Sequence, residues 1–209
     1  MKNSTKTRKI IQGIKSRKIE VSFDGGHITS DAGLLLVRHI DKKLRITSRV
    51  AKCIEDKRER KKVTHEIKNM ISQLVYGIVA GYEDITDHNE LKNDLMFKTA
   101  VNVNPEDVLA SAPTLCRLEN SVDKNDLMQI AKLLINIFIE SYKNPPKELT
   151  FDFDATDAKL YGNQENKYFH GYYDDYCFLP LYVFCGHKLL VSYLRPSWKD
   201  PAHHCGIFP

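Results

Sequence analysis

Three aspartates stand close together in the stretch FDFDATDAK, namely Asp152, Asp154 and Asp157. Residues 149–154 alternate between apolar and polar side chains, which predicts a strand with Asp152 and Asp154 on one face. Hard divalent cations such as Mg²⁺ require several oxygen ligands at short range, so the three carboxylates are candidate metal ligands. The alternative is that they are solvent-facing residues at the end of a strand, where acids are common.

Two other groups of reactive side chains have simpler explanations. His203, His204 and Cys205 are adjacent, and without a distant partner they cannot close a tetrahedral metal site within this chain. The acids around Asp84 and Asp87 are explained at least as well by helix capping as by catalysis.

The 5 cysteines include no CxxC pair, which argues against a disulfide framework or a zinc ribbon and predicts reduced thiols in the cytoplasm.

Basic residues gather in two blocks near the start of the chain. Seven lie in residues 1–18, which contain no acid, and ten lie in residues 41–62, so the net charge of +4 comes from the first block. Such blocks fit contact with a polyanion, although solvated helix faces and a terminal arm without a partner would look the same. The candidate DNA-contacting residues in them are Lys6, Arg8, Lys9, Lys15, Arg17, Lys18, Arg58, Arg60 and Lys61.

Local patterns predict a short strand and two helices in the first half of the chain. Residues 19–23 alternate and stop at a glycine-rich turn, which is typical of a strand. Ser30 is a candidate cap for a first helix. Thr64 is expected to open a second, because apolar residues then recur at three-and-four spacing until Gly81 supplies a stop.

Further helices are expected before residue 146. Short ones are predicted at 88–101, with Asp87 and Glu90 as a capping box, and at 105–110. The longest is expected to begin at Asp123 and to end at the Asn144-Pro145-Pro146 segment.

Residues 108–120, VLASAPTLCRLEN, admit two interpretations. One is a helix, a tight turn and a second helix whose Thr114 and Arg117 face outward, as in helix-turn-helix readers of DNA. The other is a pair of packed helices without a role in DNA binding. Arg117 is therefore a further candidate DNA contact.

The character of the chain changes after residue 146. Beyond the strand at 149–154, a turn is expected at 162–164, and two strand-like runs at 178–185 and 188–194 flank the turn Gly186-His187. These runs predict a β-meander, with no helix to cover it and a free edge. The fold class is therefore α+β, a mostly helical region followed by a sheet.

Several long stretches resemble the N-terminal half of DDE transposases from bacterial insertion sequences, the DDE transposase group one domain family. They are FDGGHITSDAGLLLVRHID, YGIVAGYEDITDHNELKND, APTLCRLENSV, PPKELTFDFDATDAKLYGNQE, YFHGYYDDYCFLPLYVFCG and LLVSYLRPS. The resemblance implies a helical DNA-binding region, then the first three strands of an RNase H-like domain whose Asp, Asp, Glu triad binds Mg²⁺ or Mn²⁺. Asp154 matches the first acid of that triad, and the ends of an insertion sequence are the implied double-stranded DNA partner.

No residue after Ser197 matches the second Asp or the Glu of that triad. We therefore expect a basic arm at 1–20, a DNA-binding region at 21–146, three sheet strands at 147–197 and a tail at 198–209 outside the family. This describes a truncated transposase that is inactive by itself. The alternative is a catalytically dead DNA-binding protein that inhibits or regulates transposition, with self-association or full-length transposase as further partners.

No apolar run approaches the ~18 residues of a membrane-spanning helix, and no apolar signal core follows the basic N-terminus. The sequence therefore predicts a soluble cytoplasmic protein without a membrane partner.

Overall fold

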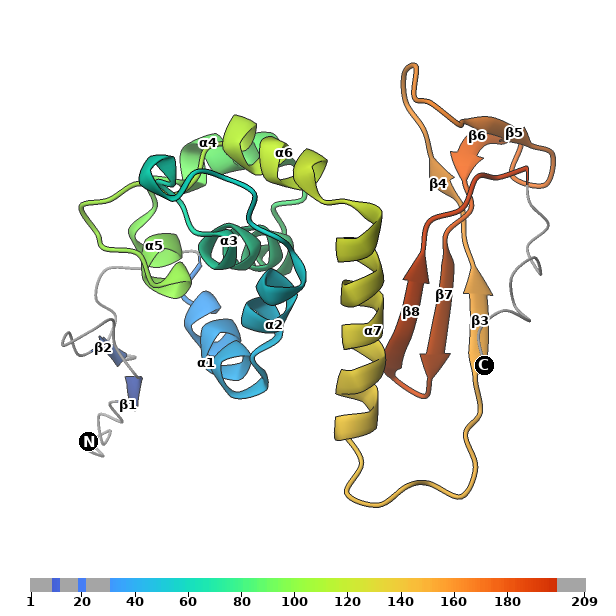
Figure 1. The fold of residues 1–209 in the computed structure, drawn as a ribbon, viewed down its shortest axis with the longest axis horizontal. Helices are drawn as coiled ribbons and strands as arrows, with labels where there is room; N and C mark the ends of the chain where they lie inside the picture. The colour runs from blue at the N-terminus through green and yellow to red at the C-terminus, as the bar shows by residue number, and fades with distance from the viewer. Residues whose placement is uncertain (1–8, 12–18, 22–30, 199–209) are drawn as a thin grey trace, which may run out of the picture. The chain divides into compact units, whose positions relative to one another are not determined.

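The computed structural model describes residues 9–11, 19–21 and 31–198, and the chain divides into two compact units, Met1–Leu127 and Met128–Pro209 (Figure 1). The first unit is mainly helical and the second holds two small antiparallel sheets. The predicted α+β class is confirmed. No helix in the described part of the chain is both long enough and apolar enough to cross a membrane.

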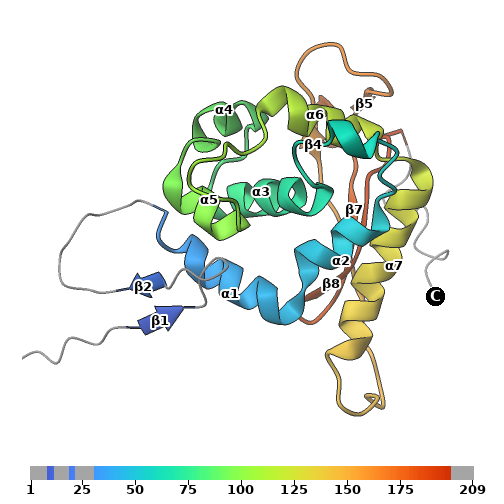
Figure 2. The same cartoon turned by 60° about the vertical axis from the view of Figure 1, so that its left-hand side comes forward.

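Helix α3 forms the centre of the first unit. It contacts α1, α2, α5 and α6, and both views place it between α1 and α2 on one side and α4 and α6 on the other (Figures 1 and 2). The helical elements are α1 (Leu34–Leu44), α2 (Ile46–Cys53), η1 (Arg60–Lys62), α3 (Ile67–Ala80), η2 (Ile85–Asp87), α4 (His88–Leu91), α5 (Leu95–Val101), α6 (Ala112–Ser121) and α7 (Lys124–Glu140). One core cluster is built from the buried side chains of Leu34, Tyr76, Leu91, Phe97, Val101 and Leu109.

The predicted end of α3 is confirmed and its predicted start is wrong. Gly81 follows the helix in the left-handed conformation at φ 92°, and its N–H bonds back to the carbonyls of Gly77 and Ile78. The helix begins at Ile67 with Glu66, not Thr64, at the N-cap position. Helix α1 begins at Leu34 with Gly33 at the N-cap, and Ser30 lies outside the described residues.

The expected helix at 88–101 is divided in two by Asp94. The Asp94 carboxylate accepts from the N–H of Phe97 at 2.6 Å and starts α5 as a new helix. The capping box of Asp87 and Glu90 is wrong, because the side chain of Asp87 makes no cap hydrogen bond. Asp84 is the acid that caps, accepting from the N–H of Thr86 at 2.8 Å.

No helix forms at 105–110. The backbone N–H groups there bond to distant parts of the unit: that of Leu109 donates to the carbonyl of Lys92 at 3.0 Å, and that of Ala110 to Oε1 of Gln73 at 3.1 Å. Residues 105–107 form only a turn, in which the N–H of Asp107 donates to the carbonyl of Asn104 at 3.1 Å, and the tertiary hydrogen bonds of Leu109 and Ala110 prevent a helix from continuing, so the local helix signal of Asn104-Pro105 is overridden.

The predicted cap of α7 is confirmed. The Asp123 carboxylate accepts from the N–H groups of Asn125 at 2.8 Å and Asp126 at 3.1 Å. Asp126 returns the bond by accepting from the N–H of Asp123 at 3.2 Å, so the two acids form a reciprocal capping box. The helix ends at Glu140, several residues before the first proline.

Two paired strands precede the helices in the chain. Strand β1 (Lys9–Ile11) pairs antiparallel with β2 (Ile19–Val21), with Lys9 opposite Val21. The predicted strand at 19–23 is thus confirmed over its first three residues, whereas the expected glycine turn after it lies outside the described residues. Pairing within the basic arm was not anticipated.

The second unit contains two three-stranded sheets in place of the expected single meander. Their orders are β3-β7-β8 and β4-β6-β5 (Figure 1). The strands are β3 (Asp152–Ala155), β4 (Ala158–Lys159), β5 (Tyr168–His170), β6 (Asp175–Phe178), β7 (Leu181–Cys185) and β8 (Lys188–Tyr193). The segment from β4 to β6 pairs with itself, and β7 returns to lie beside β3. The turn at Gly186-His187 is confirmed.

Helix α7 covers β7 and β8 on one face of the β3-β7-β8 sheet, so the expectation of a sheet without a covering helix is wrong for these strands. The edge at β3 agrees with the expectation, because β3 is an edge strand and Leu149, Phe151 and Phe153 stay exposed. Phe138 packs in one cluster with Leu181, Val183, Leu190 and Val191, and Tyr142 borders it. The covering helix thus lies before the sheet in the chain, and its C-terminal part makes the contact.

Candidate active-site strand and nucleic-acid interface

Strand β3 places Asp152 and Asp154 on the solvent side of its sheet. Phe153 is opposite Val183, whose side chain packs with α7, so the two flanking carboxylates point to the other face. Asp152 is opposite Phe184 and Asp154 is opposite Tyr182. Both aspartates are exposed, and Phe153 between them is 39% exposed as well; the pairing register, which places Asp152 and Asp154 on one face, is what agrees with the predicted alternation.

Asp157 lies just beyond the end of β3 and is half-buried. The N–H of Thr156 donates to the carbonyl of Pro180 at 3.2 Å, which holds the chain against β7 up to this point. Burial, and then chiefly the charge of Asp157 with a smaller effect from Asp154, raises the pKa of the Tyr173 phenol. Tyr173 is therefore an electrostatic neighbour of both acids, and no local motif pointed to it.

The described residues do not form a complete metal site. Carboxylate oxygens are suitable ligands for a hard divalent cation, but residues 9–11, 19–21 and 31–198 contain no group of three His, Cys, Asp or Glu side chains able to hold one. The predicted trio of Asp152, Asp154 and Asp157 is thus not brought together as a metal-binding cluster. His203, His204 and Cys205 lie outside the described residues.

Most of the basic arm also lies outside the described residues. This applies to Lys6, Arg8, Lys15, Arg17 and Lys18, and of Lys9 only the backbone pairing in β1 is described. Their role as DNA contacts stays a prediction.

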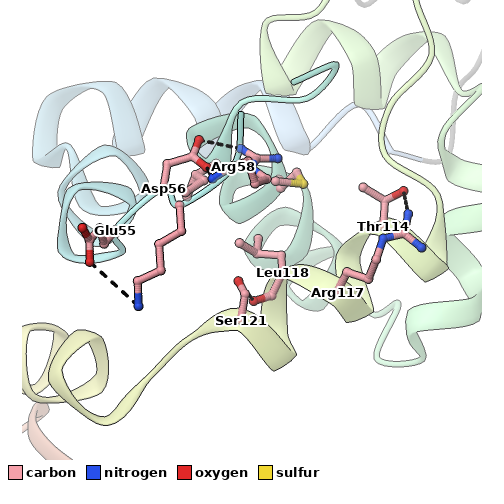
Figure 3. A pocket seen from close by; sticks show the side chains of 10 residues that line it. Glu55, Asp56, Arg58, Thr114, Arg117, Leu118 and Ser121 are labelled. Carbon is pink, nitrogen blue, oxygen red and sulfur yellow. Dashed lines mark hydrogen bonds and ion pairs between the residues drawn. The ribbon is translucent and has the colours of Figure 1, made fainter. Parts of the chain in front are cut away.

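Arg58 and Arg117 line one pocket of about 240 Å³ in the first unit. Arg58 comes from the loop between α2 and η1, and Arg117 from α6. Figure 3 shows the Asp56–Arg58 pair on one side and Arg117 with Thr114 on the other. The rest of the lining includes Ile67, Met70 and Leu118, which give it an apolar part. Only the tertiary structure brings these two predicted DNA contacts together.

Arg58 is committed to contacts within the protein. Its Nε and Nη2 atoms donate to the two carboxylate oxygens of Asp56 at 2.7 and 2.8 Å, and Nη1 donates to the carbonyl of His65 at 2.9 Å. The side-chain hydrogen bond with Asp56 raises the pKa of Arg58. A bidentate pair of this kind fixes geometry, so Arg58 orders the loop from 55 to 65.

Arg117 is arranged differently. It is exposed on α6, and its Nη2 donates to Oγ1 of Thr114 at 2.9 Å. Within the described part of the chain, neither Arg117 nor the exposed Arg60 and Lys61 of η1 takes part in an ion pair. The positive charges of Arg60 and Lys61 in η1 and of Arg117 in α6 are thus exposed to solvent.

The helix-turn-helix interpretation of residues 108–120 is wrong. Residues 108–111 form no helix, and α6 is a single helix from Ala112 to Ser121. The reason is the same tertiary hydrogen bonding that keeps Leu109 and Ala110 out of a helix. Thr114 and Arg117 do share one side of α6, as that interpretation required of its second helix.

A family model described as transposase DDE domain group 1 matches residues 11–207. The chain belongs to this transposase family. The comparisons with curated proteins and with solved structures found no match. Membership supports a function in transposition, and transposases of this family generally use divalent metal ions.

Two structural features of this transposase-family chain escaped sequence reasoning. The first is the ion pair of Lys57 Nζ with Asp123 at 2.9 Å, which joins the basic loop to the start of α7. The second is the segment β4–β6, which forms a sheet of its own between the strand that carries Asp154 and its partner β7. The ion pair has no local signal, because its two residues lie far apart in the chain, whereas the small sheet is built within residues 158–178.

Proposed function

We propose that this chain acts in DNA transposition, that it binds the ends of an insertion sequence through its helical unit, and that Asp154 is the first acid of the catalytic set. The observation that carries the proposal is the position of Asp154, exposed on the open face of strand β3 in a chain matched to a DDE transposase family over residues 11–207.

The DNA-binding part of the proposal is supported by the cations of η1 and α6. Arg60, Lys61 and Arg117 are exposed and lack ion-pair partners among the described residues, so a phosphate would meet their charge without displacing a carboxylate. Arg58 acts as a positioning residue through Asp56 and the carbonyl of His65. The basic arm at 1–18 adds long-range attraction.

The catalytic part of the proposal assigns Asp154 a role as one oxygen ligand. One carboxylate cannot define a two-metal site, and the described residues gather no third donor around Asp154. We therefore expect the purified chain not to cleave DNA by itself. The same observation favours the second candidate function, a DNA-binding protein that occupies element ends and regulates the active enzyme.

DNA binding is tested by the salt dependence of affinity for a labelled duplex. Lys61→Ala and Arg117→Ala should each lower the log–log slope by about 0.9 if the residue contacts one phosphate. Lys147→Ala is the matched control, since Lys147 is an exposed lysine in the second unit. Equal slopes for all three variants would remove η1 and α6 from the interface.

The catalytic assignment is tested with supercoiled DNA in Mg²⁺ or Mn²⁺. The expected result is no nicking by the unaltered chain. Nicking that disappears in Asp154→Asn would confirm the role of Asp154. It would also show that the chain completes its own metal site, which contradicts the proposal that the chain alone does not cleave DNA.

A further inference from the structure

Exposed aromatic side chains are concentrated in the second unit. Every large aromatic side chain found exposed among the described residues belongs to it, and the two most exposed are Tyr172 at 85% and Tyr161 at 83%, in the loops of the β4-β6-β5 sheet. Aromatic rings are usually among the larger contributors to a buried core. A set of rings left in solvent on one small sheet therefore indicates a binding surface.

Phe169 and Tyr176 form the centre of this surface. They are directly opposite each other on β5 and β6, with ring centroids 5.7 Å apart and an interplanar angle of 72°. Phe169 is 54% exposed and Tyr176 is 49% exposed. We call this side of the sheet the Phe169–Tyr176 face.

The strand alternation separates the charges of the sheet between its two sides. Lys159 and Asp175 point away from the Phe169–Tyr176 face, and they pair with each other at 3.3 Å. Lys167 instead places Nζ over the Tyr176 ring, 5.5 Å from its centroid, where it also donates to the carbonyl of Gly162 at 2.9 Å. The strand residues of this face thus include no carboxylate, and a cation stands at its border.

The opposite side of the sheet is covered at its centre. Cys177 is fully buried there, the hydroxyl of Ser197 donates to the carbonyl of Tyr168 at 2.8 Å, and Trp198 contacts the Tyr168 ring edge to face. Tyr168 and Trp198 are nevertheless 42% and 56% exposed, so the two sides differ mainly in charge: the strand carboxylate, Asp175, lies on the side opposite the Phe169–Tyr176 face.

We infer that the Phe169–Tyr176 face binds unpaired nucleotides of single-stranded DNA, with bases stacked on the two rings and Lys167 paired with a phosphate. Exposed rings on a small sheet beside a cation suit this ligand, because every base has a π-face and stacking needs no sequence-specific hydrogen bond. Duplex DNA is a poorer fit, since its bases are stacked on each other and a single lysine neutralises little of its charge. The choice of DNA rests on the proposed function.

The test uses the full chain and a fluorescently labelled oligo(dT), with a labelled duplex in parallel. Tyr176→Leu and Phe169→Leu keep an apolar side chain and remove the ring. Each should weaken oligo(dT) binding at least about fivefold, the loss of one stacked base, and leave duplex affinity unchanged. Lys167→Gln should lower the oligo(dT) salt slope by about 0.7. Tyr193→Leu is the matched control, a 44% exposed tyrosine on β8.

Several outcomes would overturn the inference. The first is equal oligo(dT) affinity in Tyr176→Leu and Tyr193→Leu. The second is a loss of duplex affinity in Tyr176→Leu that parallels its loss of oligo(dT) affinity. The third is a molecular mass of Tyr176→Leu, measured by light scattering, that differs from that of the unaltered chain while the oligo(dT) affinity is the same. The last would make the face an interface between copies. As a readout without any variant, 2-aminopurine within the strand should change its fluorescence on binding, and an unchanged signal would also count against stacking.

The two proposals fail separately. Loss of duplex binding in Arg117→Ala with no dependence of oligo(dT) on Tyr176 supports the proposed function and removes this inference. Unchanged duplex binding in Arg117→Ala together with weaker oligo(dT) binding in Tyr176→Leu would support the Phe169–Tyr176 face as a binding site and would contradict DNA binding by the helical unit.

Discussion

The imidazole of His88 occupies the space that a side chain at position 77 would need. A Cβ atom added to Gly77 would lie 2.8 Å from Cε1 of His88 and 3.0 Å from Nε2. Gly77 is within α3 and His88 begins α4, so the absence of a side chain in one helix allows the other to approach. Both residues lie in the unit that carries the proposed DNA-binding surface.

Gly77→Ala should destabilise the first unit despite the better helix propensity of alanine. Alanine favours a helix interior by about 1 kcal/mol over glycine, whereas overpacking of a buried contact costs about 1–3 kcal/mol. Gly33→Ala is the matched control, because nothing lies within 4 Å of an added Cβ there. Urea unfolding of Gly77→Ala in a His88→Ala background should show stabilisation instead, and destabilisation in both backgrounds would contradict the contact.

Stability should fall as the pH drops below about 6.5, in part because of His88. The ring is 2% exposed, and burial lowers its pKa, against a weaker opposite effect of Asp87. The side-chain amide of Gln73 lies 3.2 Å from Nδ1 and donates to it, because Oε1 of Gln73 accepts from Ala110. Nδ1 therefore accepts a hydrogen bond and carries no proton, so the folded state favours the neutral imidazole of His88.

The sign follows from this lowered pKa. Between the two pKa values the unfolded chain binds a proton that the folded chain does not, so the free energy of unfolding rises with pH. His88→Gln should make the unfolding free energy less dependent on pH between about 5 and 7. His65→Gln is the comparison, with a half-buried ring whose pKa burial also lowers, and it should have the smaller effect. Equal pH dependence in His88→Gln and the unaltered chain would refute the prediction.

Tyr76→Phe should lower the unfolding free energy by about 1.5–3 kcal/mol, the range for a hydrogen bond to a charged group. The Tyr76 hydroxyl donates to Oδ2 of Asp41 at 3.0 Å, and Asp41 also accepts from the N–H and the hydroxyl of Thr47. The carboxylate therefore joins α1, α2 and α3. Burial and the charge of Asp41 raise the pKa of Tyr76, so the phenol stays protonated.

Tyr82→Phe serves as the control for that measurement. Its hydroxyl donates to Asp31 over 3.3 and 3.4 Å, at the long end of the hydrogen-bond range. Chemical denaturation should show a clearly smaller loss for Tyr82→Phe, and equal losses would mean that the Asp41 network adds nothing.

Charge removal in the arm should weaken duplex binding mainly through its salt dependence. Replacing Lys6, Arg8, Lys15, Arg17 and Lys18 together by glutamine keeps β1 intact, because none of them lies in the strand. The log–log slope should fall by about 0.9 for each residue that contacts a phosphate. Fluorescence anisotropy at several salt concentrations measures it, and an unchanged slope would exclude the arm.

Local signals were sufficient where an element depends on its own residues. The apolar spacing and Gly81 predicted the body and end of α3, Asp123 predicted the cap of α7, and alternation placed Asp152 and Asp154 on one face of a strand. The family could also be predicted, since long stretches carry its pattern. Periodicity and capping act over a few residues, so they can be read without the fold.

Only the tertiary structure decided which surfaces these elements share. No helix forms at 105–110, because Lys92 and Gln73 accept from the N–H groups of Leu109 and Ala110, and α7 covers β7 and β8 through Phe138. Arg58 and Arg117 line one pocket although many residues separate them in the chain. The physical reason is that burial and hydrogen bonds between distant segments are comparable with, or stronger than, local preferences of a few tenths to about 1 kcal/mol per residue.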